Sequence, residues 1–266
     1  MELAGYMASL IIGISLGLIG GGGSILTVPV MVYLFHVQPL LATSYSLFVV
    51  GVTSLFGAAN NYKRGFVNVN TALLFGVASI ATVFLTRKLV IPAIKDVTVS
   101  VAGLTITEPM FTMVLFALLM MAAAVSMIKT SKRPVPDIPS SKNINLSQLL
   151  LYGIGIGVVT GLLGAGGGFL LIPTLVMVVG LPMKEAVGTS LLIIALNSLI
   201  GFTGDLGHFN IDWKLLLPVT AIAISGIFIG GAIAKKIPSE KLKKGFGWFV
   251  LVMGIYILLK EVFFKR

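Results

Sequence analysis

The sequence is poor in the residues on which soluble enzymes depend. It contains no cysteine, which excludes disulfide bonds, thiolate metal sites and cysteine nucleophiles. Its two histidines, His36 and His208, are far apart, which argues against a histidine metal site. Only 11% of the residues are charged, against roughly a quarter in soluble proteins. We therefore expect neither a soluble enzyme nor a disordered chain, and no metal or cofactor.

Apolar residues dominate instead, at 57% of the chain with a mean hydropathy of +1.06. This composition predicts an all-α integral membrane protein. The net charge of +10 would suggest nucleic acid in a soluble protein, but lysines and arginines of cytoplasmic loops explain it here, so we expect no nucleic-acid partner. The N-terminus lacks the basic start and cleavage site of a signal peptide and is interpreted as the first membrane helix.

Apolar runs predict about eight full membrane spans and two short half-helices. Most runs approach the roughly 20 residues of a spanning helix, whereas two of them are only 13 residues long, 24–36 and 168–180. A polar stretch, 129–146, carries three prolines and is predicted to be a cytoplasmic linker between a first membrane repeat, 1–128, and a second, 147–266. The other runs are 3–19, 40–59, 69–91, 108–128, 147–163, 186–203, 214–234 and 242–260.

Three blocks recur in the two halves in the same order. Residues 17–29 align with 161–173 at an offset of 144, and seven of the 13 positions are identical. Two shorter blocks recur at offsets of 146 and 142, namely 42–44 with 188–190 and 65–70 with 207–212. Near-constant spacing of three blocks predicts an internal duplication.

The orientation of the repeats depends on whether the chain reverses at the glycine-rich segment of each half. With a reversal, each half crosses the membrane five times, and 12 of the 19 lysines and arginines share one side. Without it, the division is ten to nine. The positive-inside rule therefore favours inverted repeats with both termini outside the cytoplasm.

The glycine-rich segments are the strongest candidates for a binding site. They comprise Gly20, Gly21, Gly22 and Gly23, followed by Ser24, and in the second half Gly164, Gly166, Gly167 and Gly168. Consecutive glycines disfavour a helix by about 1 kcal/mol each, and non-helical backbone at membrane depth is tolerated only when buried or lining a cavity. Helices that begin there offer free N–H groups and a partial positive charge to an anion. The absence of a following Lys-Ser/Thr argues against a nucleotide P-loop.

Glycines also permit close helix packing, and we favour that interpretation for four that have helical spacing, Gly13, Gly17, Gly153 and Gly157. Polar side chains within the apolar runs are further site candidates: Thr43, Ser44, Thr189, Ser190 and Asn197. The hydroxyls could instead bond to their own helices, and Asn197 could instead join two helices.

No Asp, Glu, Lys or Arg lies clearly in the middle of an apolar run, so no buried acid for a proton relay is evident. Asp205 and His208 could form a proton-sensitive pair, but a solvated loop is the favoured interpretation. We find no paired carboxylates or nucleophile triad and predict that the protein is not an enzyme.

Four segments resemble the TauE/SafE family of sulfite and organosulfonate exporters. They are GLIGGGGSILTVPV, GLLGAGGGFLLIP, GTSLLIIALNSLIGFTGDLGHFNIDW and GIFIGGAIAKKIPSEKLKKGFG. The resemblance covers nearly the whole chain and is better in the second half, because Gln38-Pro39 stands where the second half has Lys184-Glu185. It implies a duplicated, glycine-broken architecture and transport of sulfite, sulfonates or related anions across the inner membrane, commonly outward.

We therefore expect a secondary transporter in the cytoplasmic membrane whose small anion binds between two half-helix N-termini near the midplane. Two such termini would supply about one unit of positive charge. A passive anion channel, a transporter of another small organic anion, and a structural protein are the alternatives; the last would not need duplicated glycine breaks. Membrane lipid surrounds the protein, and a homodimer is possible.

Overall fold

The computed structural model describes residues 2–94, 99–101, 104–130, 146–234, 237 and 239–263, and it is a bundle of helices. The first half contains α1 (Glu2–Ile19), a 3₁₀ helix η1 (Gly21–Leu26), α2 (Thr27–Tyr33), α3 (Pro39–Lys63), α4 (Val69–Leu85), a π-helical segment η2 (Thr86–Val90), α5 (Ile91–Ile94) and α6 (Glu108–Thr130). The second half contains α7 (Leu146–Leu163), α8 (Gly168–Met177), α9 (Met183–Asp205), α10 (Trp213–Ala234) and α11 (Ser239–Phe263).

The apolar runs coincide with helices, as the sequence predicts. Six helices among the described residues are long and apolar enough to cross a membrane, and 3–19, 23–33 and 147–163 are shorter apolar helices. The protein is therefore a multi-pass membrane protein. One feature was not predicted: β1 (Val99–Val101) and β2 (Leu104–Ile106) form a small antiparallel hairpin between α5 and α6. The predicted linker lies almost wholly outside the described residues, so the domain boundaries stay a prediction.

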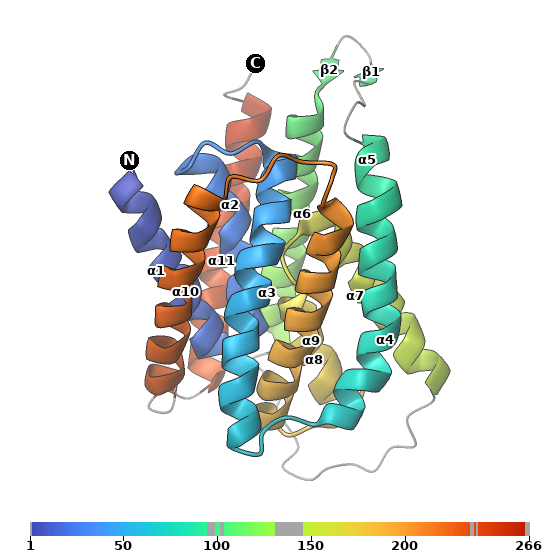
Figure 1. Cartoon of the computed structure of the whole chain (residues 1–266), viewed down its shortest axis with the longest axis vertical. Coiled ribbons are helices and arrows are strands. Elements are labelled where there is room, and N and C mark those ends of the chain that lie inside the picture. The colour runs from blue at the N-terminus through green and yellow to red at the C-terminus, as the bar shows by residue number, and fades with distance from the viewer. Residues whose placement is uncertain are drawn as a thin grey trace.

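Each half reverses direction at its glycine-rich segment. In Figure 1, α1 runs away from the end of the molecule that carries the N and C labels and the hairpin, and α2 returns toward it. We call this the terminal end. The opposite end, where α6 ends and α7 begins, is called the linker end; α3 and α10 also end there, and α9 begins there.

Helix packing repeats between the halves with the partners exchanged. Helix α1 packs on α10 and α7 on α4, while α3 packs on α9 and α6 on α11. The repetition extends to single residues: a methyl on Gly57 would meet Ile227 and Leu191, and Gly201, 144 residues later, faces Val83 and Leu47, each 144 residues earlier than its counterpart. This packing supports the predicted duplication, and the orientation of the repeats in a membrane stays a prediction.

Small residues allow the outer helix pairs to pack closely. A side chain on Gly13 or Gly17 would overlap the backbone of α10, and one on Gly157 would lie 2.8 Å from the Ser79 carbonyl oxygen of α4. Gly153 likewise faces α4. The prediction that these four glycines serve helix packing is confirmed. Of the six candidate spans, α3 and α9 are the most buried, at 72% and 67% of the residues in their apolar windows. They therefore form the centre of the bundle.

Candidate functional site

The two glycine breaks lie directly against each other in the interior. Gly20 (φ 72°) precedes η1, and Gly164 (φ 66°) and Gly167 (φ 65°) turn the chain between α7 and α8. These left-handed conformations are open to glycine and strained for most other residues. A methyl on Gly21 would lie 3.0 Å from the Gly168 carbonyl carbon and nearer still to its Cα. The predicted convergence of the two glycine segments is therefore present.

Ser24, from the first glycine segment, contacts the second one through its hydroxyl. The Ser24 hydroxyl lies within hydrogen-bonding distance of the Gly21 carbonyl oxygen, at 2.7 Å, and also contacts the Ala165 carbonyl oxygen across the interface. Ser24 is fully buried. Because Gly21 and Gly168 are in backbone contact, any room for an ion in this structure lies beside that contact rather than within it.

The predicted hydroxyls line α3 and α9, and most of them have protein partners. Thr43 donates to the Leu40 carbonyl oxygen at 2.7 Å, and Ser190 donates to the Val187 carbonyl oxygen at 2.9 Å. The Thr189 hydroxyl accepts a bond from the backbone N–H of Asn68 at 2.9 Å and so ties α9 to the start of α4. Ser44 is fully buried, and its hydroxyl faces the carboxylate of Asp205.

Asn197 joins two helices and also carries an unused donor. Its Oδ1 accepts a hydrogen bond from Ser79 of α4 at 3.0 Å, whereas its buried Nδ2 has no partner in the part of the chain that the structure describes. Ser198, the next residue, is equally buried and unpartnered, and a methyl on Gly166 would lie 3.2 Å from its hydroxyl. Asn197 therefore joins the helices and lies beside a polar patch at the second break.

Several other buried hydroxyls lack partners within the described ranges, and they concentrate on α3 and near the breaks. They are Thr27, Ser46, Thr53, Ser54 and Thr160. Buried polar groups in proteins nearly always have a partner, which is often an ordered water. This concentration of free hydroxyls marks the centre of the bundle as a place that water or a polar ligand would occupy.

A cavity of about 600 Å³ opens near the linker end, and we call it the vestibule. Its lining includes Gly17 and Gly57, and the polar residues Asn60, Asn61, Arg64 and Lys184. Val187 also lines it, and the same side chain would lie 3.1 Å from a methyl on Gly20. The vestibule thus reaches the neighbourhood of the first glycine break, and two basic residues contribute positive charge to it.

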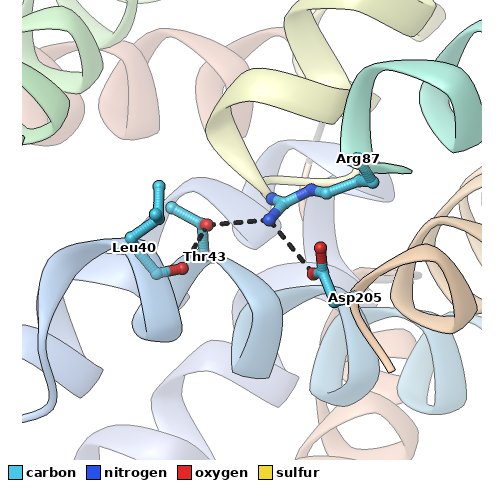
Figure 2. Close-up of polar contacts among 4 residues, drawn as sticks. All are labelled: Leu40, Thr43, Arg87 and Asp205. Atoms are coloured by element: carbon cyan, nitrogen blue, oxygen red, sulfur yellow. Dashed lines mark hydrogen bonds and ion pairs between the residues drawn. The ribbon is translucent and has the colours of Figure 1, made fainter. Parts of the chain in front are cut away.

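A buried ion pair, which Figure 2 shows in close-up, lies near the start of α3 and the end of α9, toward the terminal end. Arg87 Nη1 is 3.2 Å from Asp205 Oδ2, and both side chains are fully buried. The same nitrogen donates to the Thr43 hydroxyl at 3.0 Å. Thus α3, η2 and α9 each contribute one polar side chain. A methyl on Gly164 would lie 2.7 Å from Arg87 Nη2, so the guanidinium lies directly beside the second break.

This pair corrects several expectations made from the sequence. Charged residues were expected only at helix ends and in loops, and helix N-termini were expected to supply the positive potential of the interior; Arg87 is a full buried charge beside the site. Asp205 is fully buried at the end of α9 and does not belong to a solvated loop, although the exposed His208 beyond it does. The interior therefore holds a buried acid, where none was evident from the sequence. The missed signal is that apolar residues continue after Lys88, through Leu89 to Ile94, so Arg87 does not mark the end of its helix.

The described residues contain no group of three or more acidic or histidine side chains arranged to hold a metal ion. The chemistry that the site offers consists of backbone N–H groups, hydroxyls, amides, and one guanidinium buried with its carboxylate partner.

Known proteins are similar to this one over nearly its whole length. A family model described as "Sulfite exporter TauE/SafE" matches residues 6–257. A probable membrane transporter protein of Xylella fastidiosa is 26% identical over 256 residues, covering 94% of this chain and 92% of its own. The probable membrane transporter protein YdhB of Bacillus subtilis is 25% identical over 250 residues, covering 93% of this chain and 96% of its own.

The probable membrane transporter protein MJ0441 of Methanocaldococcus jannaschii is 36% identical over 118 residues, which is 42% of this chain and 44% of that protein. No solved structure matches the chain. The family match spans the glycine breaks, the central helices and the ion pair alike. The chain belongs to the sulfite exporter TauE/SafE family of membrane proteins.

Proposed function

We propose that this protein is a secondary transporter that moves sulfite, an organosulfonate or a related small sulfur-containing anion across the cytoplasmic membrane, in the export direction. The observation that carries the proposal is the vestibule, whose basic and amide lining leads to the first of two touching glycine breaks. The family name supports a sulfur oxyanion as the cargo. The similarity to probable membrane transporter proteins supports transport in general.

The charge of the route suits a small anion. Arg64 and Lys184 attract anions toward the vestibule, and the half-helices α2 and α8 begin beside the breaks with their partially positive ends. Backbone N–H groups there, with Thr43, Ser44, Thr189 and Ser190, would surround the anion. Moderate binding by dipoles and hydroxyls suits a transporter, because the ion must also be released.

A transporter that alternates its access fits the structure better than a permanently open channel. The linker end is hollowed by the vestibule, whereas the Arg87–Asp205 pair is fully buried toward the terminal end. The sequence duplication and the reversal of the chain in each half support inverted repeats, an arrangement that lets one site be exposed alternately to the two sides. Because the side richer in lysine and arginine faces the cytoplasm in most membrane proteins, we propose that the linker end is cytoplasmic and that the termini lie outside.

Flux measurements on purified protein in liposomes test this function. Liposomes loaded with sulfite, taurine or methanesulfonate should release the anion faster than empty-vector liposomes, and the rate should saturate with concentration. A pH gradient applied with and without a membrane potential would identify proton coupling. Flux that never saturates and follows the potential alone would favour the channel, and no flux of any sulfur oxyanion would refute the proposal.

A further inference from the structure

Only one of the three guanidinium nitrogens of Arg87 makes polar contacts with the described residues. Both of its polar contacts, to Asp205 and to Thr43, are made by Nη1. Its Nε and Nη2 are buried and have no hydrogen-bond partner among the residues that the structure describes. A buried, unpaired charged donor costs free energy. A ligand that accepted hydrogen bonds from Nε and Nη2 would remove this cost.

The unused edge has the geometry of an oxyanion receptor. Nε and Nη2 lie on the same edge of the guanidinium plane and present two parallel N–H donors, a fork that matches two oxygens of a carboxylate, sulfonate or phosphate group. An arginine that served only to pair with Asp205 would be expected to turn this fork toward the carboxylate. Here Asp205 and Thr43 instead hold one nitrogen and leave the fork free (Figure 2).

Arg87 lies beside the proposed path of the anion, which runs from the vestibule to the glycine breaks. The Nη2 atom lies beside Gly164, where a methyl group would come within 2.7 Å of it. The offset of 144 residues that relates the packing of the two halves pairs Arg87 with Gly231 and Asp205 with Asn61. Gly231 and Asn61 both line the vestibule. Arg87 and Asp205 are therefore the first- and second-half counterparts of two vestibule residues. They lie near the terminal end, where the repeat of the vestibule would be expected.

We propose that Arg87 is an oxyanion-binding residue of the transport route, whose Nε–Nη2 edge takes two oxygens of the cargo when the terminal end opens. Asp205 and Thr43 are positioning residues that orient the guanidinium through Nη1. In the present state the nearby cavity, lined by Thr43, Ile91 and Leu163, measures about 10 Å³, room for about one water. Binding of the anion thus requires this end to open, as the vestibule has at the other.

The inference rests on the proposed function and names the group that recognises the anion. It also predicts selectivity, because a fork of two donors suits an oxyanion with two coplanar oxygens better than a spherical halide. Lysine in place of Arg87 would keep the charge beside Asp205 but offer a point charge without the fork. Loss of one charge-assisted contact corresponds to about a tenfold change in affinity.

The test compares Arg87→Lys with Lys88→Gln in liposomes, using methanesulfonate as the cargo. Lys88 is exposed on the same helical turn, so its variant removes a charge at the same depth without touching the ion pair. We expect a KM about tenfold higher for Arg87→Lys, a smaller change in kcat, and an unchanged KM for Lys88→Gln. An unchanged KM in Arg87→Lys would overturn the inference.

Should the lysine variant fail to fold, competition in the wild-type protein decides the matter. Sulfate or ethanesulfonate should inhibit methanesulfonate flux at concentrations at which chloride does not. Equal inhibition by chloride would overturn the role of the fork while leaving transport intact. Absence of any wild-type flux would instead refute the proposed function itself, so the two failures are distinguishable.

Discussion

The contact between Gly21 and Gly168 predicts that a single added methyl group destabilises the protein. Neither residue has a positive φ, so alanine is compatible with the local backbone and the substitutions test the packing at the contact. In Gly21→Ala, the new carbon would lie 3.0 Å from the Gly168 carbonyl carbon and closer to its Cα, whereas carbon atoms prefer separations of about 3.5–4.0 Å. In Gly21→Ala the methyl would also meet Ile194 Cδ1, the end of a side chain that can turn away, but the Gly168 atoms are backbone and cannot. In Gly168→Ala all three of the nearest atoms belong to the Gly21 backbone.

Overpacking of this kind costs about 1–3 kcal/mol, and a backbone contact belongs at the upper end. For a chain of this size we expect the melting temperature of Gly21→Ala and of Gly168→Ala in detergent to fall by roughly 6–12 °C. Dye-based melting or fluorescence size-exclusion after heating measures it. The matched control is Gly155→Ala, because a methyl there meets nothing within 4 Å.

We expect Gly155→Ala to melt at or above the wild-type temperature, since alanine favours the helix. If Gly21→Ala and Gly168→Ala melted like this control, the two breaks would not be in contact, and the proposed centre of the route would be misplaced.

Three further predictions concern the site, the topology and pH. Thr43→Ala should raise the KM for anion flux about fivefold, the effect of one hydrogen bond, and Thr43→Ser should restore it; equal kinetics of the two variants would remove Thr43 from the site. Single cysteines at Lys63 and Leu206 should label with an impermeant thiol reagent only from the inside and only from the outside, respectively, and the reverse result would invert the topology. His208→Gln should leave the pH profile of flux unchanged, because His208 is an exposed residue in the loop after α9; a shift near pH 6–7 would make His208 a proton sensor.

Much of the architecture could be predicted from the sequence because membrane helices are encoded locally. Continuous apolar runs define the helices, and the glycine runs mark where each half breaks. The residues that turn the chain, Gly20, Gly164 and Gly167, lie within the predicted segments. The small β1–β2 hairpin was missed because three-residue strands leave almost no periodic signal.

The Arg87–Asp205 pair could not be predicted, because its partners are 118 residues apart and meet only through the packing of η2 on α9. Each of them lies close to the expected end of an apolar run, where a charge is ordinarily solvated. The roles of Thr43 and Thr189 were equally hidden: the sequence marks both as buried hydroxyls, while only the folded chain shows that one holds an arginine and the other a backbone N–H.

The most direct test of the account asks whether the anion passes through the vestibule. A single cysteine at Asn60, which lines the vestibule, would be treated from the linker side with a negatively charged methanethiosulfonate, and methanesulfonate flux would be measured before and after. A cysteine at Lys63, outside the lining at the same end of α3, is the control. The account predicts that modification at position 60 abolishes flux and that modification at position 63 does not. Full modification of the cysteine at position 60 with normal flux would contradict it.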